Sequence, residues 1–355
     1  CDQKQKSYSF SFLWHSFCIL KIGIKMLISM ILISMIIKDE IVFSKVVQSF
    51  ESEPYCTDHF YRGIEPKFIQ KPSYRRICQT KESINTRKLF YATLYDTKLK
   101  IPVYSAYTLE IGASQKRPKW MVEPQLENKT LGDDMVTSRS VNRLYEFKTQ
   151  ASDQDYKAYG KINFLTRGHL NPNAYHDGRE RIATFSLTNI VPQYDKFNSG
   201  SWNKAESAVK EIMAKYCFGN QEQRTLPYVK KYVNAEAYFI TGAIPSDHPS
   251  DVIGRNVTIP KMSFTAVCCT DPVRQKKFSF GFYGYNVRDT RLQGTRAVDL
   301  FELQDLLNKE WPGNKKNGAQ DVWFFEDGCG AEDGLIYVNT MNRKLNGNRK
   351  FRGRY

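Results

Sequence analysis

The chain has 355 residues, of which 41% are hydrophobic and 14% aromatic, and this content excludes a disordered or low-complexity protein. The formal net charge is +15 and the sequence pI is about 9.3. Such an excess favours an acidic polymer such as nucleic acid as the partner, although a generic basic secreted protein carries the same signal.

The first 44 residues are predicted to be an upstream segment followed by a secretory signal. Residues 1–25 are either upstream translated sequence or a fragment end. Residues 26–37 (MLISMILISMII) follow basic residues and are shorter than the roughly 20 apolar residues of a membrane span, so they fit a signal peptide. We expect cleavage near Ser44 and a secreted, extracellular product without stable membrane insertion. The alternative is an uncleaved anchor over Phe10–Ile37.

Cysteine usage agrees with secretion. Six cysteines remain when Cys1 and Cys18 are set aside, and an even number after a signal peptide predicts disulfide bonds. We expect a local Cys56–Cys78 loop and pairing within the remaining set of Cys217, Cys268, Cys269 and Cys329. Asn128 and Asn256 each begin a sequon for N-glycosylation, which predicts a glycoprotein.

Residues 45–340 are predicted to form one mixed α+β domain, and residues 341–355 a basic C-terminal tail. In the first third, Leu89–Thr108 predicts two strands joined by a turn at the polar DTKLK. Residues 125–150 are polar and charged, which is typical of a surface excursion. No internal repeat or Pro-rich linker divides the domain.

The middle of the chain predicts a strand, a loop, a second strand and a helix. Ile162–Leu165 is a short strand that delivers Arg167-Gly168-His169, and Ala183–Ile190 is the second strand. Ser199–Tyr216 has an apolar stripe at helical spacing, with Asn198 or Ser199 at the N-cap.

The last third predicts more strands and one helix. The strands are expected at Ala237–Ala243, Val257–Ile259, Met262–Cys269 and Lys277–Tyr285, and a short amphipathic helix is expected at Val298–Asn308.

Arg167, Gly168 and His169 carry the first chemical signal. Hydrolysis of a phosphodiester needs a base that activates water, and an imidazole titrates near neutral pH, so His169 is the candidate base. On an extended segment, Arg167 lies on the same face as His169, and its guanidinium suits a phosphate oxygen. Gly168 would let backbone and substrate approach closely. The alternative is a surface His–Arg pair on a basic protein.

Asn198 is the candidate metal ligand, because an amide oxygen suits a hard cation such as Mg²⁺, with Mn²⁺ or Ca²⁺ as alternatives. Glu206 lies near the same helical face and could hold a metal-bound water. Otherwise Asn198 only caps the helix and Glu206 is a solvated charge.

Three further polar residues border this stretch. Asn189 and Gln193 lie in the loop before the helix and either position His169 and the substrate or serve as turn residues. His176 lies in a turn near the site, where it either contacts substrate or is a plain turn histidine.

Taken together, these motifs resemble a known family. Arg167-Gly168-His169-Leu170-x-Pro172, Asn189-x-x-Pro192-Gln193 and Asn198-x-x-x-Trp202-x-x-x-Glu206 are similar in order and spacing to the DNA/RNA non-specific endonuclease family of the ββα-metal (His-Me finger) fold. Residues 75–79, 90–110 and 120–127 further resemble the secreted endonuclease domain-containing 1 proteins. The likeness spans most of residues 45–330.

The resemblance implies a mixed or antiparallel central sheet with a ββα-metal motif, and hydrolysis of DNA and RNA to 5′-phosphate products. His169 matches the general base, and Asn198 matches the single protein ligand of a water-rich Mg²⁺. Arg167 matches the arginine that stabilises the transition state, Glu206 the glutamate that holds metal-bound water, and Asn189 a supporting asparagine near the scissile phosphate. Gln193 and His176 are additional candidate substrate contacts. DNA and RNA are the expected partners, and no dedicated protein partner is evident.

One position departs from the family pattern. The signature usually opens with Asp before Arg-Gly-His, and this chain has Thr166 there, which keeps a hydroxyl but loses the charge. The first alternative is therefore a catalytically weak or inactive nucleic-acid-binding protein on the same fold. The second is a membrane-tethered or extracellular interaction protein.

Overall fold

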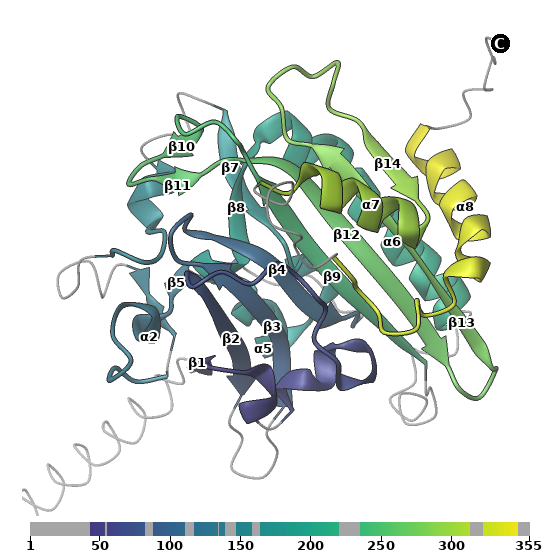
Figure 1. Ribbon diagram of the computed structural model, residues 1–355, viewed down its shortest axis with the longest axis horizontal. Coiled ribbons are helices and arrows are strands. Elements are labelled where there is room, and N and C mark those ends of the chain that lie inside the picture. Colours follow the sequence, from purple (N-terminus) through teal and green to yellow (C-terminus); the bar gives the residue numbers. More distant parts are fainter. Residues whose placement is uncertain are drawn as a thin grey trace, which may run out of the picture. The chain divides into compact units, whose positions relative to one another are not determined.

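An antiparallel eight-stranded sheet runs through the described part of the chain, in the order β1-β2-β3-β4-β9-β12-β13-β14 (Figure 1). Its strands are β1 (Phe43–Val47), β2 (Tyr74–Lys81), β3 (Lys88–Asp96), β4 (Ile101–Thr108), β9 (Glu236–Pro245), β12 (Pro260–Asp271), β13 (Lys276–Tyr285) and β14 (Thr295–Val298). Two-stranded ribbons pair β5 (Met121–Val122) with β6 (Val136–Thr137), β7 (Leu165–His169) with β8 (Ile190–Tyr194), and β10 (Val252–Ile253) with β11 (Val257–Thr258). The predicted mixed α+β class with an antiparallel central sheet is confirmed.

The computed structural model describes residues 43–53, 55–81, 88–110, 117–133, 135–138, 147–157, 164–219, 235–312 and 322–346. The predicted signal, with its apolar core at 26–37, lies outside these residues and stays a prediction. The described residues belong to one compact unit.

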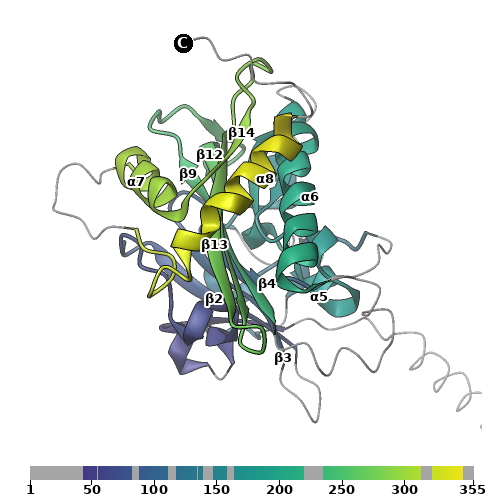
Figure 2. The ribbon, with the colours of Figure 1, turned by 90° about the vertical axis from the view of Figure 1, so that its right-hand side faces the viewer.

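The central strands are buried on both faces, because helices cover both sides of the sheet. The α-helices are α2 (Pro124–Glu127), α5 (Gly178–Ala183), α6 (Asn203–Ile212), α7 (Leu300–Glu310) and α8 (Leu335–Asn346). Helices α6 and α7 lie on opposite sides of the sheet (Figure 2). Because it is buried on both faces, β9 reads as a nearly continuous apolar run, while β13 alternates aromatic residues with Ser and Gly, and the sequence predicts both strands well.

Short helical turns connect these elements. They are η1 (Phe50–Ser52), η2 (Cys56–His59), η3 (Tyr61–Gly63), η4 (Asn173–Tyr175), η5 (Leu187–Asn189), η6 (Phe197–Trp202), η7 (Met213–Cys217) and η11 (Ala331–Gly334). Segments η6 and η7 are π-helical and flank α6, so the chain is helical without a break from Phe197 to Cys217. The predicted helix at Ser199–Tyr216 is confirmed, but Asn198 and Ser199 lie inside it and neither is its N-cap.

Two adjacent cysteines on β12 form disulfide bonds on opposite faces of the sheet. Side chains alternate along a strand, so Cys268 and Cys269 point to opposite faces. Cys269 bonds to Cys217 at the end of η7, and Cys268 bonds to Cys329 on the α7 side. With the Cys56–Cys78 bond, all three pairings agree with the prediction.

The second strand predicted in the middle of the chain is wrong. Ala183–Ile190 contains the end of α5 and the turn η5, and the true strand β8 begins only at Ile190. Serine and threonine hydroxyls explain the difference, since they bind nearby backbone groups and compete with strand formation. Thr184 donates to the Arg181 carbonyl at 2.7 Å, and the Ser186 hydroxyl accepts from the Thr188 amide at 3.3 Å.

Two other predicted boundaries move. The strand expected to end at Leu165 begins there, so Arg167, Gly168 and His169 lie within β7 and do not follow it. The predicted tail from residue 341 is helical as far as Asn346, where Met341 is fully buried against α6. Residues 347–355 lie outside the described part.

Candidate active site

Strands β7 and β8 and the helix η6–α6 form a ββα unit, with β7 and β8 paired antiparallel. A cavity of about 790 Å³ opens beside this unit. It is lined by residues of β7, of the helix and of several neighbouring segments, among them Thr166, Arg167, His169, Asn198, Glu206, Arg117, Trp120, Tyr156, Lys157 and Phe185. The structure thus brings together four of the seven predicted site residues.

His169 lies between two aromatic rings. Its ring centroid is 5.3 Å from that of Trp120 and 5.2 Å from that of Phe185. Its buried Nε2 has no hydrogen-bond partner among the described residues. Burial, together with the charges of Arg117 and Arg181, lowers the pKa of His169 to about 3. The imidazole is therefore neutral at physiological pH, and Nε2 is able to accept a proton.

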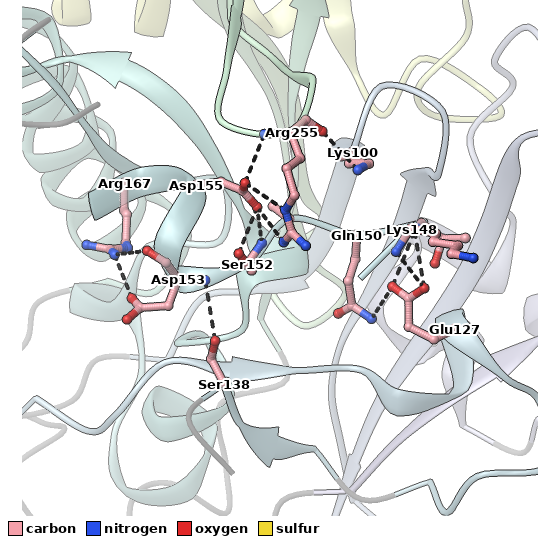
Figure 3. Close-up of polar contacts among 12 residues, drawn as sticks. Lys100, Glu127, Ser138, Lys148, Gln150, Ser152, Asp153, Asp155, Arg167 and Arg255 are labelled. Carbon is pink, nitrogen blue, oxygen red and sulfur yellow. Dashed lines mark hydrogen bonds and ion pairs between the residues drawn. The ribbon is translucent and has the colours of Figure 1, made fainter. Parts of the chain in front are cut away.

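The Arg167 guanidinium is held by an ion pair with Asp153 and by two aromatic rings. One of its terminal nitrogens donates to Asp153 Oδ1 at 2.6 Å and to the Asp153 carbonyl at 3.2 Å (Figure 3). The guanidinium carbon lies 5.4 Å from the ring centroids of both Trp120 and Tyr156. Its buried Nε has no hydrogen-bond partner among the described residues, so the fixed guanidinium keeps donor capacity for a ligand.

Asn198 is held by the residue that departs from the family pattern. Its Nδ2 donates to the Thr166 hydroxyl at 2.9 Å, and that hydroxyl lies 3.2 Å from the Gln193 carbonyl on the paired strand. Because the amide nitrogen is engaged, the carboxamide oxygen is the end of Asn198 that remains for a ligand.

Glu206 lies one helical turn beyond Asn203 on the cavity wall. Burial raises the pKa of its carboxyl to about 8. The group is therefore largely protonated at neutral pH unless a cation binds nearby, since an adjacent positive charge favours the carboxylate.

The remaining predicted residues lie away from the cavity. The Asn189 carboxamide is fully used inside the protein: Oδ1 accepts from Ser105 at 2.9 Å and from the Asn171 amide at 3.0 Å, while Nδ2 donates to the Asn171 and Thr184 carbonyls. This placement fits a role in shaping the ribbon and brings no group of Asn189 to the cavity.

Gln193 and His176 are also buried behind the cavity wall. Gln193 donates to Ser263 at 2.8 Å, and its side chain fills the space in front of Gly168, where a Cβ would meet Gln193 Oε1 at 1.9 Å. A side chain at position 168 would therefore collide with Gln193, so packing within the ribbon accounts for the glycine. His176 is within 2.6 Å of Asn171 Oδ1 and packs edge-on against Tyr107.

Several cavity residues were missed by the sequence reasoning. Tyr156 and Lys157 come from a helical turn that begins more than ten residues before β7, and Arg117 and Trp120 lie further upstream. Asp153 begins the same turn and contacts Arg167 without lining the cavity. The i, i+4 spacing of Asp153 and Lys157, which form an ion pair, was the one local signal available.

The donor set of the cavity fits a metal that keeps most of its water. Among the described residues, no group of three or more His, Cys, Asp or Glu side chains is arranged to hold a metal ion. A cation here would depend on the Asn198 oxygen and, through water, on Glu206. Oxygen donors with retained water suit Mg²⁺, so the residues present fit the expected ion.

Comparison with known proteins identifies the family. The family described as DNA/RNA non-specific endonuclease matches residues 70–287, more than half of the chain. The chain belongs to this family. The match covers the ββα unit and every predicted site residue.

Among individual proteins, the human endonuclease domain-containing 1 protein is 28% identical over 278 residues, which cover 75% of this chain and 49% of that protein. The mouse protein of the same name is 26% identical over 279 residues, or 78% of this chain and 47% of that protein. The salivary endonuclease of Lutzomyia longipalpis is 28% identical over 123 residues, or 34% and 30% of the two chains. The chain spans about half the length of the first two relatives.

A solved structure of an EndoG/EndoGI complex also resembles the chain, with a TM-score of 0.41 and 16% identity over 65% of this chain and 82% of that one. Within the described ranges, none of the helices has the length and apolar character needed to cross a membrane.

Proposed function

We propose that this protein is a metal-dependent endonuclease that hydrolyses phosphodiester bonds of both DNA and RNA and leaves 5′-phosphates. The observation that carries the proposal is the buried, unpartnered Nε2 of a neutral His169 beside Arg167 and Asn198 in one cavity. A neutral imidazole without a competing partner is suited to take a proton from an attacking water.

The steps assigned to the chain's own residues follow from this placement. His169 removes a proton from water as the oxygen bonds to phosphorus, the bond from phosphorus to the departing 3′ oxygen breaks, and that oxygen takes up a proton from solvent water. Arg167, immobilised by Asp153, donates to a phosphate oxygen and stabilises the charge that develops there. Asn198 and, through water, Glu206 would hold Mg²⁺. When bound, the ion supplies neutralisation of charge on the phosphoryl group.

The lack of sequence or sugar preference is supported by the kind of side chain that the cavity offers. Arg117, Lys157 and Arg167 are cations that suit the backbone phosphates, which are common to DNA and RNA and carry no sequence information.

Secretion is part of the proposal. Three disulfides fit an oxidising compartment, and the two sequon residues, Asn128 and Asn256, are both exposed and accessible to glycosylation.

The test is cleavage of plasmid DNA and of RNA by the full chain, with and without Mg²⁺, compared with His169→Ala. We expect cleavage that depends on Mg²⁺ and falls by roughly 10²- to 10⁴-fold in His169→Ala, because a positioned base contributes that much. End-labelling of the products would show 5′-phosphates.

One observation favours a second candidate, a nucleic-acid-binding protein with little or no activity. Thr166 brings no charge to a position where the family usually has a carboxylate. A folded protein that binds DNA in a salt-sensitive way, but does not cleave it at any Mg²⁺ concentration, would establish this candidate in place of the endonuclease.

A further inference from the structure

Thr166 and Asn198 lie 32 residues apart in sequence and meet at the edge of the cavity. Thr166 is on β7, opposite Gln193 of β8, and Asn198 is in the second residue position of η6. The Thr166 hydroxyl has two polar neighbours: the Gln193 carbonyl at 3.2 Å and the Asn198 Nδ2 at 2.9 Å.

The hydrogen count of these groups fixes the direction of both bonds. A hydroxyl has one hydrogen to donate, and a backbone carbonyl can only accept. The Thr166 hydrogen is therefore used on the Gln193 carbonyl, and toward Asn198 the hydroxyl can only accept. The amide nitrogen of Asn198 can satisfy it, whereas the amide oxygen cannot.

We infer that Thr166 is a positioning residue that orients the Asn198 carboxamide, so that its oxygen faces the cavity as the metal ligand. The inference rests on the proposed function, because it assigns a role toward the metal of that site. The two ends of a carboxamide are nearly equal in size, so packing alone selects poorly between them, while a hard cation accepts only the oxygen.

The same reasoning explains why the departure from Asp at position 166 preserves the ligand. A carboxylate can only accept hydrogen bonds, so an Asp would select the same amide end of Asn198. Thr166 makes this selection with a neutral group, because the Gln193 carbonyl takes up its only hydrogen. What this chain lacks is the negative charge at position 166, while the orientation of the ligand is kept.

Metal binding, measured separately from cleavage, tests the inference. Mn²⁺ affinity is determined by electron paramagnetic resonance on the full chain for the wild type, Thr166→Val and Thr166→Ser. Valine has nearly the shape of threonine without the hydroxyl, and serine retains the hydroxyl. We expect Mn²⁺ to bind about tenfold more weakly to Thr166→Val, because one hydrogen bond to the ligand is lost, and close to wild-type affinity for Thr166→Ser.

Thr97→Val is the matched control. The Thr97 hydroxyl also donates to a backbone carbonyl, that of Ser73 at 2.7 Å, but Thr97 does not line the cavity. Its Mn²⁺ affinity is expected to equal that of the wild type. Circular dichroism and the melting temperature identify any variant that fails to fold.

Asn198→Asp separates orientation from general damage to the site. Both terminal atoms of an aspartate side chain are oxygens, so either of them can face the metal. In the Asn198→Asp background, Thr166→Val is therefore expected to have no effect on Mn²⁺ affinity. A merely structural role of Thr166 would give the same loss in both backgrounds.

Cleavage measured in parallel distinguishes the two proposals. Equal Mn²⁺ affinity in the wild type and Thr166→Val overturns the inference, even if the wild type cleaves DNA. Absence of Mn²⁺ binding in the wild type also overturns it. Binding that follows the hydroxyl, in a protein that never cleaves, upholds the role of Thr166 and refutes the endonuclease.

Discussion

Two polar regions lie side by side in this protein and differ in how completely their buried polar groups are hydrogen-bonded. In the segment 150–157, the carboxylates of Asp153 and Asp155 have hydrogen-bond partners. In the neighbouring cavity, some buried polar atoms have no partner among the described residues. Asp155 accepts five hydrogen bonds, from the amide and hydroxyl of Ser152 and from the amide and guanidinium of Arg255 (Figure 3). These bonds hold the pKa of Asp155 below its ordinary value despite burial.

The cavity shows the reverse. His169 Nε2 and Arg167 Nε are buried without hydrogen-bond partners among the described residues, and burial raises the pKa of Glu206 to about 8. Unsatisfied buried polar groups destabilise a fold, so two such groups beside one cavity indicate atoms that are available to a ligand. Asp153 joins the two regions, because it belongs to the satisfied segment and contacts Arg167 of the cavity.

The largest expected effect is on stability and belongs to the satisfied region. In Asp155→Ala, Arg255 and the Ser152 amide lose a buried partner, and we expect the free energy of unfolding to fall by about 3–5 kcal/mol. Chemical denaturation measures this. Asp289→Ala is the control, because its ion pair with Arg291 is exposed and screened by solvent, so the free energy of unfolding is expected to stay close to that of the wild type. Equal losses in the two variants would remove the contrast between the regions.

The next effect is on catalysis, at the residue that joins the two regions. Asp153→Asn keeps the shape but removes the charge that fixes Arg167. A hydrogen bond to a charged group is worth about 1.5–3 kcal/mol, so we expect kcat to fall roughly ten- to hundredfold, with a smaller change in KM. Steady-state cleavage of a short oligonucleotide measures the split. A change confined to KM would mean that Asp153 acts on binding and does not position Arg167 for the transition state.

The sequence predicts the central sheet well and the site ribbon less well, for a physical reason. Strands such as β9 and β12 are buried on both faces, and burial selects long apolar runs that are easy to recognise. In the ribbon β7–β8 each strand has only five residues, and β7 carries the polar side chains of Thr166, Arg167 and His169 that line the cavity. Local hydroxyl contacts around Thr184 and Ser186 then decide where β8 begins, and no periodicity reports them.

The same limit applies to the candidate site. Residue type and spacing pointed to His169, Arg167, Asn198 and Glu206, because an imidazole, a guanidinium and oxygen donors are what the chemistry needs. The partners that tune them are tertiary contacts, such as Trp120 against His169 and Asp153 against Arg167. These partners are far apart in the sequence, and a single sequence contains no pattern that shows which distant residues are in contact.

A pH-dependent effect is expected at Glu206 in metal-free protein. The folded-state pKa of about 8 lies above the ordinary value of 4.5, so the stability associated with the protonated group is present below pH 4.5 and is lost as the pH rises through 8. Glu206→Gln cannot ionise. We therefore expect its melting temperature in EDTA to match that of the wild type near pH 4 and to exceed it increasingly toward pH 9.

The control for Glu206→Gln is Glu332→Gln, which changes an exposed glutamate outside the cavity. Its difference from the wild type is expected to be small and independent of pH. A Glu206→Gln difference that is constant from pH 4 to 9 would show that the carboxyl has the same pKa in the folded and unfolded protein, so that burial in the cavity does not raise it.

The smallest expected effect is on the salt dependence of binding at Arg117. This cation lines the cavity and lowers the pKa of His169, and no ion pair neutralises it among the described residues. If it contacts one phosphate, Arg117→Gln removes one released counterion, and the slope of log K against log salt for duplex DNA becomes shallower by about 0.9.

Binding is measured in a His169→Ala background to prevent cleavage, with Arg291→Gln as an exposed control away from the cavity. Because the slope counts phosphate contacts regardless of base sequence, the same change on several DNA sequences would mark Arg117 as a backbone contact. An unchanged slope would mean that its charge acts on His169 alone, and that substrate phosphates are held by the clamped Arg167 and its neighbours.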